Sequence, residues 1–300
     1  MTSVCVAGAG TIGSLFAAFL ARVSDVSVLT RREEHAHALR EHGLRVSGRA
    51  DFTATVRAAA DPAALDADLV IVACKGNDLA PLAARLEGSF EGATVMTVQN
   101  GLGAEEVVAE HGDWPLLSSV TFMSGTRHSD VHVQYILDTA TWIGPYRATT
   151  GDDARRVADL IVSSGLKAEG FDDLRPAQWS KLIFNATVNS VAALTGLPHD
   201  RHFAEGALGD LVHGLVDEGK ATAAAAGVEL GEDPWEMNVL ATRRGYAHRP
   251  SMLEDVEARR PTEIDLITGS LVREARSRGV PVPLHAALYE LVKAKEAGYS

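Results

Sequence analysis

Residues 3–22 read Ser3-Val-Cys-Val-Ala-Gly8-Ala-Gly10-Thr-Ile-Gly13-Ser-Leu-Phe-Ala-Ala-Phe-Leu-Ala-Arg22. A short β-branched run, Ser3–Ala7, precedes the glycine pattern G-x-G-x-x-G, and a helical run, Ser14–Arg22, follows it. This order of strand, turn and helix is typical of the first unit of a dinucleotide-binding α/β domain. The turn residues, all expected to contact a dinucleotide, are Gly8, Ala9, Gly10, Thr11, Ile12 and Gly13.

The three glycines of this motif have different physical tasks. Gly8 permits the tight turn, Gly10 lets the backbone approach a pyrophosphate, and Gly13 lets the helix pack close to the strand. The N-terminus of the helix attracts the phosphate charge. A purely structural glycine turn is the alternative, but the position directly after a strand favours a dinucleotide.

Two arginines, Arg31 and Arg32, follow the second expected strand, Val26–Thr30. A carboxylate at this place binds the 2′-hydroxyl group of NAD, whereas guanidinium groups suit the 2′-phosphate of NADP. Glu33 and Glu34 come next and are expected to open a helix, where acidic residues suit the helix dipole. The sequence therefore favours NADPH over NADH, with solvated arginines as the alternative interpretation.

Lys75 and Asn100 stand at the ends of two later strands. Asp68–Lys75 is a nearly continuous apolar run, as in a parallel strand covered on both faces, and Ala93–Val98 is another. Open α/β sheets bind ligands beyond the carboxyl ends of their strands. We therefore expect both side chains at the cofactor, with a solvated lysine and a turn asparagine as the alternatives.

The strand patterns stop near residue 170. Three runs predict hairpin strands that close the far edge of the first domain: Leu116–Met123, Val131–Ile136 and Thr141–Gly144. Helices are expected over Leu174–Thr195, Ala204–Ala226, from Pro234 onward, Met252–Ala258, Glu263–Arg278 and Pro283–Lys295. The predicted fold class is α/β + all-α. An N-terminal Rossmann-type domain covers residues 1–170, a helical substrate-binding and catalytic domain covers residues 171–300, and a ligand cleft lies between them.

Lys181, Asn185 and Asn189 stand four residues apart in a helical run that is otherwise largely apolar, Trp179–Leu194. This spacing places the three side chains on one face of the helix. Because apolar residues crowd the other faces, the helix is expected to be buried nearly all round. A buried cation and two buried amides require polar partners from the protein or from a ligand. A solvent-facing polar stripe is the alternative.

The composition limits the class of partner. The formal charge of −12 over 300 residues argues against nucleic acid or an anionic membrane as the main partner, but not against a small anion in a cleft. Cys5 and Cys74 lie in strand-like runs and are expected to stay reduced in a cytoplasmic protein. No apolar run approaches the roughly 20 residues that span a bilayer, and we expect no signal peptide. The scattered histidines predict no metal site.

A second polar cluster extends from Arg249 to Asp265. By local pattern, Ser251 and Thr262 are expected to cap helices that begin at Met252 and Glu263. A catalytic role for Glu263 does not follow from this pattern alone.

Taken in order, these motifs resemble the ketopantoate reductase family (2-dehydropantoate 2-reductases) over nearly the whole chain. The motifs that carry the resemblance are Gly8–Gly13, Lys75, Gln99-Asn100-Gly101, the Lys181/Asn185/Asn189 helix, Ser251-Met-Leu and Thr262-Glu263-Ile-Asp265. The resemblance implies NADPH-dependent reduction of a small 2-oxo acid, foremost 2-dehydropantoate to pantoate in pantothenate and coenzyme A biosynthesis.

The resemblance also implies a role for each matching residue. Arg31 contacts the 2′-phosphate, and Lys75 and Asn100 position the cofactor and the substrate. Lys181 matches the catalytic lysine, and Glu263 matches the glutamate of the family's motif. The positions that hold the substrate's carboxylate and hydroxyl groups are Asn185, Asn189 and Ser251.

A general-acid role for Lys181 agrees with the chemistry of hydride transfer. Negative charge develops on the carbonyl oxygen, which needs a nearby cation or proton donor. Desolvation lowers the pKa of a buried lysine, whereas a nearby carboxylate such as that of Glu263 raises it. The sequence leaves open which effect prevails.

Several alternatives stay open. The chain has Thr126-Arg-His-Ser-Asp130 where the family often has a Pro-Gly turn, which weakens the assignment of ketopantoate and leaves another branched 2-oxo acid open. A β-hydroxyacid dehydrogenase also joins a Rossmann domain to a helical domain and uses a lysine. A non-catalytic NADP(H)-binding regulator would need no such lysine. A homodimer formed through the helical domain is also left open.

Overall fold

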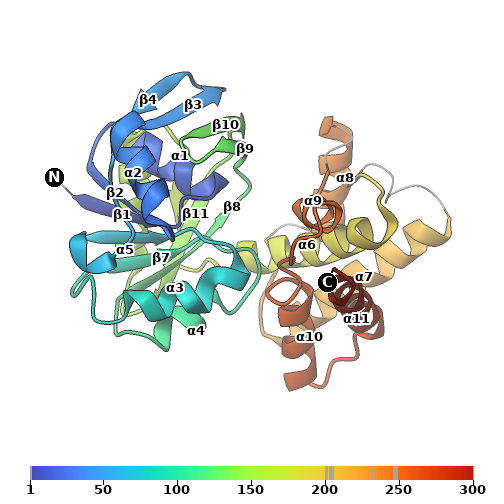
Figure 1. The fold of residues 1–300 in the computed structure, drawn as a ribbon. Helices are drawn as coiled ribbons and strands as arrows, with labels where there is room; N and C mark the ends of the chain where they lie inside the picture. Colours follow the sequence, from blue (N-terminus) through green and yellow to red (C-terminus); the bar gives the residue numbers. More distant parts are fainter. Residues whose placement is uncertain (1, 200–201, 203–205, 232, 246–248, 300) are drawn as a thin grey trace. The chain divides into compact units, whose positions relative to one another are not determined.

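A computed structural model describes residues 2–199, 202, 206–231, 233–245 and 249–299 (Figure 1). The chain divides into two compact units. The first comprises Met1–Gln99 and Ala104–Leu174, and the second comprises Asn100–Gly103 and Arg175–Ser300. The division expected at residue 170 is therefore slightly early, and one short loop, Asn100–Gly103, belongs to the helical unit.

An eight-stranded sheet forms the centre of the first unit, in the order β12-β11-β8-β7-β6-β1-β2-β5. Its strands are β1 (Ser3–Ala7), β2 (Asp25–Leu29), β5 (Arg57–Ala59), β6 (Leu69–Val72), β7 (Thr94–Thr97), β8 (Leu116–Thr121), β11 (Thr141–Arg147) and β12 (Ala168–Gly170). All neighbouring strands are parallel except β8 and β11. The order moves outward from β1 in both directions, which confirms the predicted Rossmann-type fold.

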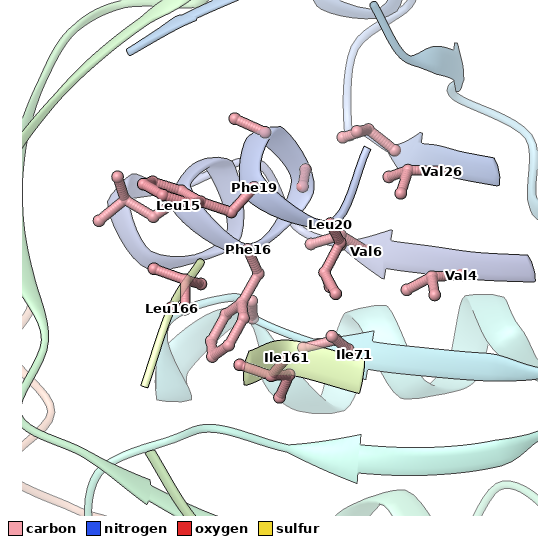
Figure 2. Close-up of a cluster of buried hydrophobic side chains, with 14 of the residues drawn as sticks. Val4, Val6, Leu15, Phe16, Phe19, Leu20, Val26, Ile71, Ile161 and Leu166 are labelled. Carbon is pink, nitrogen blue, oxygen red and sulfur yellow. The ribbon is translucent and has the colours of Figure 1, made fainter. Parts of the chain in front are cut away.

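Helices cover both faces of this sheet. They are α1 (Thr11–Leu20), α2 (Glu33–His42), α3 (Leu79–Leu86), α4 (Ala104–Ala109) and α5 (Gly151–Ser163). Alternate side chains of β1 point to opposite faces. Val4 and Val6 pack with α1 and α5, whereas Cys5 and Ala7 pack with α3 and α4. Figure 2 shows Phe16 of α1 reaching into the first of these two cores.

A second sheet of four strands has the order β4-β3-β10-β9. Its strands are β3 (Leu44–Gly48), β4 (Phe52–Ala54), β9 (Ser124–Ser129) and β10 (His132–Leu137). The expected strand Val131–Ile136 therefore does not close the far edge of the main sheet. It pairs instead with β9 and, in parallel, with β3, where Val133 lies opposite Val46. Of the three expected hairpin strands, only those that became β8 and β11 pair in the main sheet.

The second unit is helical, and its described residues contain no strand. Its helices are α6 (Arg175–Thr195), α7 (Ala207–Ala225), α8 (Pro234–Gly245), α9 (Ser251–Glu257), α10 (Thr268–Ser277) and α11 (Pro283–Ala297). The long helix α6 packs against each of the other five. The start expected at residue 204 lies outside the described residues. Within the described part of the chain, no helix is long and apolar enough to cross a membrane.

Two expected helix starts are wrong. Helix α9 begins at Ser251 itself, with Pro250 at the N-cap position, so Ser251 does not cap this helix. Helix α10 begins at Thr268. Glu263 instead lies in an irregular turn that precedes the helix, which places its side chain in a setting that helix periodicity did not predict.

Candidate active site

Gly8 and Gly13 are required by the packing of the first unit itself. Gly8 has a φ angle of +107°, and a Cβ atom there would lie 2.8 Å from the backbone nitrogen of Cys74. A Cβ atom at Gly13 would lie 2.0 Å from the carbonyl oxygen of Gly8. A side chain at Gly8 would therefore collide with the backbone that follows β6, and a side chain at Gly13 would push α1 away from the turn that precedes it.

Gly10 requires a different explanation. Its φ angle is −77°, and a Cβ atom there would meet only the carbonyl oxygen of Ala73, at an ordinary 3.8 Å. Gly10 is exposed and stands at the N-cap of α1, where no side chain satisfies the first backbone N–H groups. The missing side chain leaves open space at a helix N-terminus, which fits the approach of a pyrophosphate. Of the other residues expected to contact the dinucleotide, Ala9 lies in the turn, whereas Thr11 and Ile12 lie in the first turn of α1, and all three are partly buried.

The two arginines after β2 have different partners. A guanidinium nitrogen of Arg31 lies 3.5 Å from a carboxylate oxygen of Asp78, and 78% of the Arg31 side chain is exposed. Arg32 makes a much shorter ion pair with Asp130, at 2.6 Å. Lys75, also exposed, immediately precedes the 3₁₀ turn that contains Asp78. Two cations, Arg31 and Lys75, therefore flank the same short turn beyond β6.

Lys181, Asn100 and Glu263 meet in the second unit. The ammonium group of Lys181 donates a hydrogen bond of 2.8 Å to Oδ1 of Asn100. The amide nitrogen of Asn100 donates in turn to Oε2 of Glu263, at 3.3 Å. Asn100 thus joins the cation to the carboxylate, although its two partners come from distant parts of the sequence.

Burial controls the acidity of Lys181. Desolvation lowers the pKa of its ammonium group from 10.5 to about 8, and the negative charge of Glu263 opposes this shift. Burial therefore has a larger effect on the pKa of Lys181 than the carboxylate of Glu263. A lysine with this pKa is mostly protonated at neutral pH and gives up its proton much more readily than an exposed lysine.

The loop that carries Asn100 is held tightly against the second unit. Gly101 has a φ angle of +97°, and a Cβ atom there would lie 1.7 Å from the carbonyl oxygen of Leu266. The backbone N–H of Leu102 donates to the same carbonyl, at 3.1 Å. Only glycine allows this approach, so the residue that follows Asn100 fixes where the amide lies.

The turn that carries Glu263 is anchored at both ends. The carbonyl of Glu263 accepts hydrogen bonds from the backbone N–H groups of Leu266 and Ile267. Upstream, the backbone N–H and the hydroxyl of Thr262 both donate to Glu296 of α11, each at 2.6 Å. Local pattern gave no sign of Glu296. Its role could be found only once α11 and this turn were placed side by side.

Asn185 and Asn189 are buried on the same face of α6 as Lys181, with 9% and 5% of their surface exposed. Neither amide makes a side-chain hydrogen bond within the described residues, yet neither is sealed from solvent. Two buried amides with unused donors and acceptors are available to a polar ligand. Ser251 is exposed at the start of α9, and no hydrogen bond joins its side chain to Lys181.

The predicted residues therefore fall into two groups. The glycine turn, Arg31 and Lys75 belong to the first unit, and Asn100 joins Lys181 and Glu263 in the second. The sequence predicted that Asn100 follows a strand and lies beside the cofactor. It did not predict the hydrogen bonds of Asn100 to Lys181 and Glu263. Among the described residues, no group of three or more His, Cys, Asp or Glu side chains is arranged to hold a metal ion.

Family models match both parts of the chain. The model described as ketopantoate reductase PanE/ApbA matches residues 4–148. The model described as ketopantoate reductase PanE/ApbA C terminal matches residues 173–296. Together they cover the glycine turn, the polar face of α6 and the turn that carries Glu263.

Individual relatives extend over the whole chain. The 2-dehydropantoate 2-reductase of Halobacterium salinarum is 32% identical over 302 residues, covering 97% of each chain. The crystal structure of a PanE/ApbA family ketopantoate reductase from Ralstonia eutropha JMP134 has a TM-score of 0.91 at 26% identity, covering 99% of each chain. A D-mandelate dehydrogenase solved with NADH and anilino(oxo)acetate has a TM-score of 0.89 at 24% identity and covers 99% of each chain, a likeness of fold.

Proposed function

The chain belongs to the ketopantoate reductase family, and from this premise we propose that it reduces a small 2-oxo acid with NADPH, with 2-dehydropantoate as the substrate. It is an oxidoreductase, and the family is one of dinucleotide-dependent reductases. The observation that carries the proposal is the buried Lys181, whose lowered pKa and hydrogen bond to Asn100 suit a proton donor.

The first unit supplies the cofactor site in this proposal. The open N-terminus of α1 at Gly10 receives the pyrophosphate, and Arg31 receives the 2′-phosphate. Lys75 adds a second cation beside the same short turn. When bound, NADPH supplies the hydride that adds to the ketone carbon of the substrate.

The second unit supplies the proton. As the carbon–oxygen π bond breaks, its electrons move to the oxygen, where negative charge develops. The ammonium group of Lys181 stabilises this charge and transfers one proton to the oxygen, which leaves a neutral amine and a 2-hydroxy acid. Asn100 orients the ammonium group, and Glu263 holds the amide of Asn100.

Asn185, Asn189 and Ser251 bind the rest of the substrate. The two amides supply both donors and acceptors, which a carboxylate and a hydroxyl group on one small acid would use. Their lack of partners within the described residues supports this role, because buried amides are rarely left without hydrogen bonds. A 2-oxo acid that carries a hydroxyl group, such as 2-dehydropantoate, satisfies more of these groups than a purely hydrocarbon side chain.

Steady-state oxidation of NADPH tests the reaction, the cofactor and the substrate together. The panel contains 2-dehydropantoate, its analogue without the hydroxyl group, and the 2-oxo acid that corresponds to mandelate, with the reverse reaction measured for each 2-hydroxy acid. We expect the highest kcat/KM with 2-dehydropantoate. Turnover of another acid alone would retain the mechanism and reject this substrate, whereas NADPH binding without any oxidation would favour a non-catalytic regulator.

Lys181→Ala tests the proposed proton donor. We expect kcat to fall by a factor of about 100 or more, with the Kd of NADPH nearly unchanged, since general acids contribute roughly 10²–10⁴-fold. Lys220→Ala is the matched control, because Lys220 lies in the same unit but forms an ion pair with Asp233 on the surface. Near-normal turnover of the Lys181 variant would contradict the assignment.

A further inference from the structure

Acidic side chains engage both arginines that follow β2. Asp130, in the turn between β9 and β10, holds Arg32 at 2.6 Å and Arg127 at 2.9 Å. Asp78, in the turn after β6, lies 3.5 Å from Arg31. These two acids were not foreseen from the sequence, because each lies far along the chain from its arginine.

Arg32 is held in place by contacts with other residues of the first unit. Besides its short ion pair with Asp130, its backbone carbonyl accepts a 2.8 Å hydrogen bond from the hydroxyl of the buried Thr30. The ring of His35, one turn further along α2, bonds to the backbone carbonyl of Asp130 at 2.8 Å. Arg32 therefore joins α2 to the β9–β10 turn. Of the two arginines, Arg31 has the more exposed side chain, at 78% against 51%, and the longer ion pair, at 3.5 Å against 2.6 Å.

The partner of Arg31 has the wrong charge for a phosphate site. A 2′-phosphate carries roughly −1.5 to −2 charges at neutral pH and would use the same guanidinium group as the Asp78 carboxylate. The 2′-hydroxyl group of NADH is neutral and takes no part in this competition. A carboxylate beside Arg31 therefore opposes the binding of NADPH and leaves the binding of NADH almost unaffected.

We infer that Asp78 is a specificity-determining residue that limits the preference for NADPH by competing with the 2′-phosphate for Arg31. The inference rests on the proposed function, in which Arg31 is the phosphate ligand. It follows from the geometry of one exposed ion pair, in which Asp78 contacts Arg31 directly, and from the shorter ion pair that holds Arg32 to Asp130 and leaves Arg31 as the proposed phosphate ligand.

The expected effect of removing the carboxylate is modest. An exposed ion pair contributes little, so loss of the Asp78 charge should increase the affinity for NADPH about two- to fivefold. Loss of Arg31 should weaken NADPH binding roughly 10- to 100-fold, as expected for charge-assisted hydrogen bonds to a phosphate. Because both effects are electrostatic and exposed to solvent, they should shrink as the salt concentration rises.

The test measures the Kd of NADPH and of NADH by nucleotide fluorescence in the full chain and four variants. These are Asp78→Asn, Arg31→Ala, the double variant and Asp66→Asn. Asp66 is the matched control, because it forms a similar exposed ion pair with Arg57, at 3.4 Å, beside the amino ends of the strands. We expect Asp78→Asn to tighten NADPH alone, and we expect this gain to vanish when Arg31 is also replaced.

Three outcomes would overturn the inference. They are weaker NADPH binding by Asp78→Asn, equal tightening of both nucleotides, or an equal gain in the Asp66→Asn control. Unchanged NADPH binding by Arg31→Ala would reject both the inference and the proposed phosphate ligand. Since the assay needs no turnover, failure to reduce any 2-oxo acid would count against the proposed function while the binding comparison still decides the role of Asp78.

Discussion

Replacing Glu263 with glutamine should move the alkaline limb of the pH–rate profile to lower pH. Lys181 acts as an acid in the proposed reduction, so activity is present below its pKa and is lost as the pH rises through it. Burial lowers this pKa, and the negative charge of Glu263 opposes the shift. Glutamine keeps the size of the side chain and a hydrogen-bond acceptor for Asn100, but removes the charge that keeps Lys181 protonated.

The magnitude follows from the pKa of Lys181, which is lowered from 10.5 to about 8. At pH 8 about half of the enzyme then carries a protonated lysine. A single nearby carboxylate that is partly solvated changes a pKa by roughly one pH unit. In the Glu263→Gln protein about one tenth of the lysine would be protonated at pH 8, so kcat relative to its own acidic plateau should fall about fivefold.

The assay is kcat between pH 6 and 9.5, with saturating NADPH and 2-oxo acid, normalised to the plateau of each variant. Normalisation matters because Glu263 also holds Asn100, so its loss can lower the plateau itself. Glu290→Gln is the control, since Glu290 is an exposed glutamate of the same unit. An unchanged limb, or one that moves to higher pH, would refute the reasoning that Glu263 acts on Lys181 through its charge.

Two further predictions concern the surroundings of this lysine. Gly101→Ala should lower the free energy of unfolding by about 2 kcal/mol or more and reduce kcat, because a Cβ atom would lie 1.7 Å from the carbonyl oxygen of Leu266. Urea unfolding measures the first effect, and steady-state kinetics measures the second. Asn185→Ala and Asn189→Ala should each raise the KM for the 2-oxo acid about fivefold or more, with little change in the free energy of unfolding. Ser190→Ala is the control. It loses a buried hydrogen bond of 2.7 Å, so it should lose about 1 kcal/mol of stability and keep its KM. A normal KM in both asparagine variants would show that these amides do not hold the substrate.

Local pattern was enough to predict the strand, the glycine turn and the helix to which we assign the dinucleotide. The expected first strand and β1 have the same bounds, Ser3–Ala7, and a helix follows the glycine turn, although α1 begins at Thr11 and not at the expected Ser14. The reason is physical, since a buried parallel strand and a glycine turn leave their marks on consecutive residues. The four-stranded sheet was missed because β4 is only three residues long and the alternation of apolar and polar residues in β3 covers only Leu44–Ser47 before Gly48, which is too short to stand out from a loop.

The polar face of α6 was likewise predictable, because its spacing of four residues is a local property. The partners of that face were not. Asn100 lies 81 residues before Lys181, and Glu263 lies 163 residues after Asn100. No periodicity links such positions. Only the order of motifs shared with a family suggested that these residues act together, and even this order left the direction of the Lys181 pKa shift undecided.

The contact between Lys181 and Asn100 explains how a buried ammonium group can remain acidic. A carboxylate bonded directly to the ammonium group would satisfy it but would also raise its pKa, which would hinder proton transfer to the substrate. An alanine would leave the buried cation with one hydrogen bond fewer. Asparagine accepts from the lysine and donates to Glu263 at the same time, which no carboxylate can do. The amide therefore gives the buried cation a neutral acceptor, and desolvation, the largest influence on the ammonium group, lowers its pKa to about 8 against the opposing charge of Glu263.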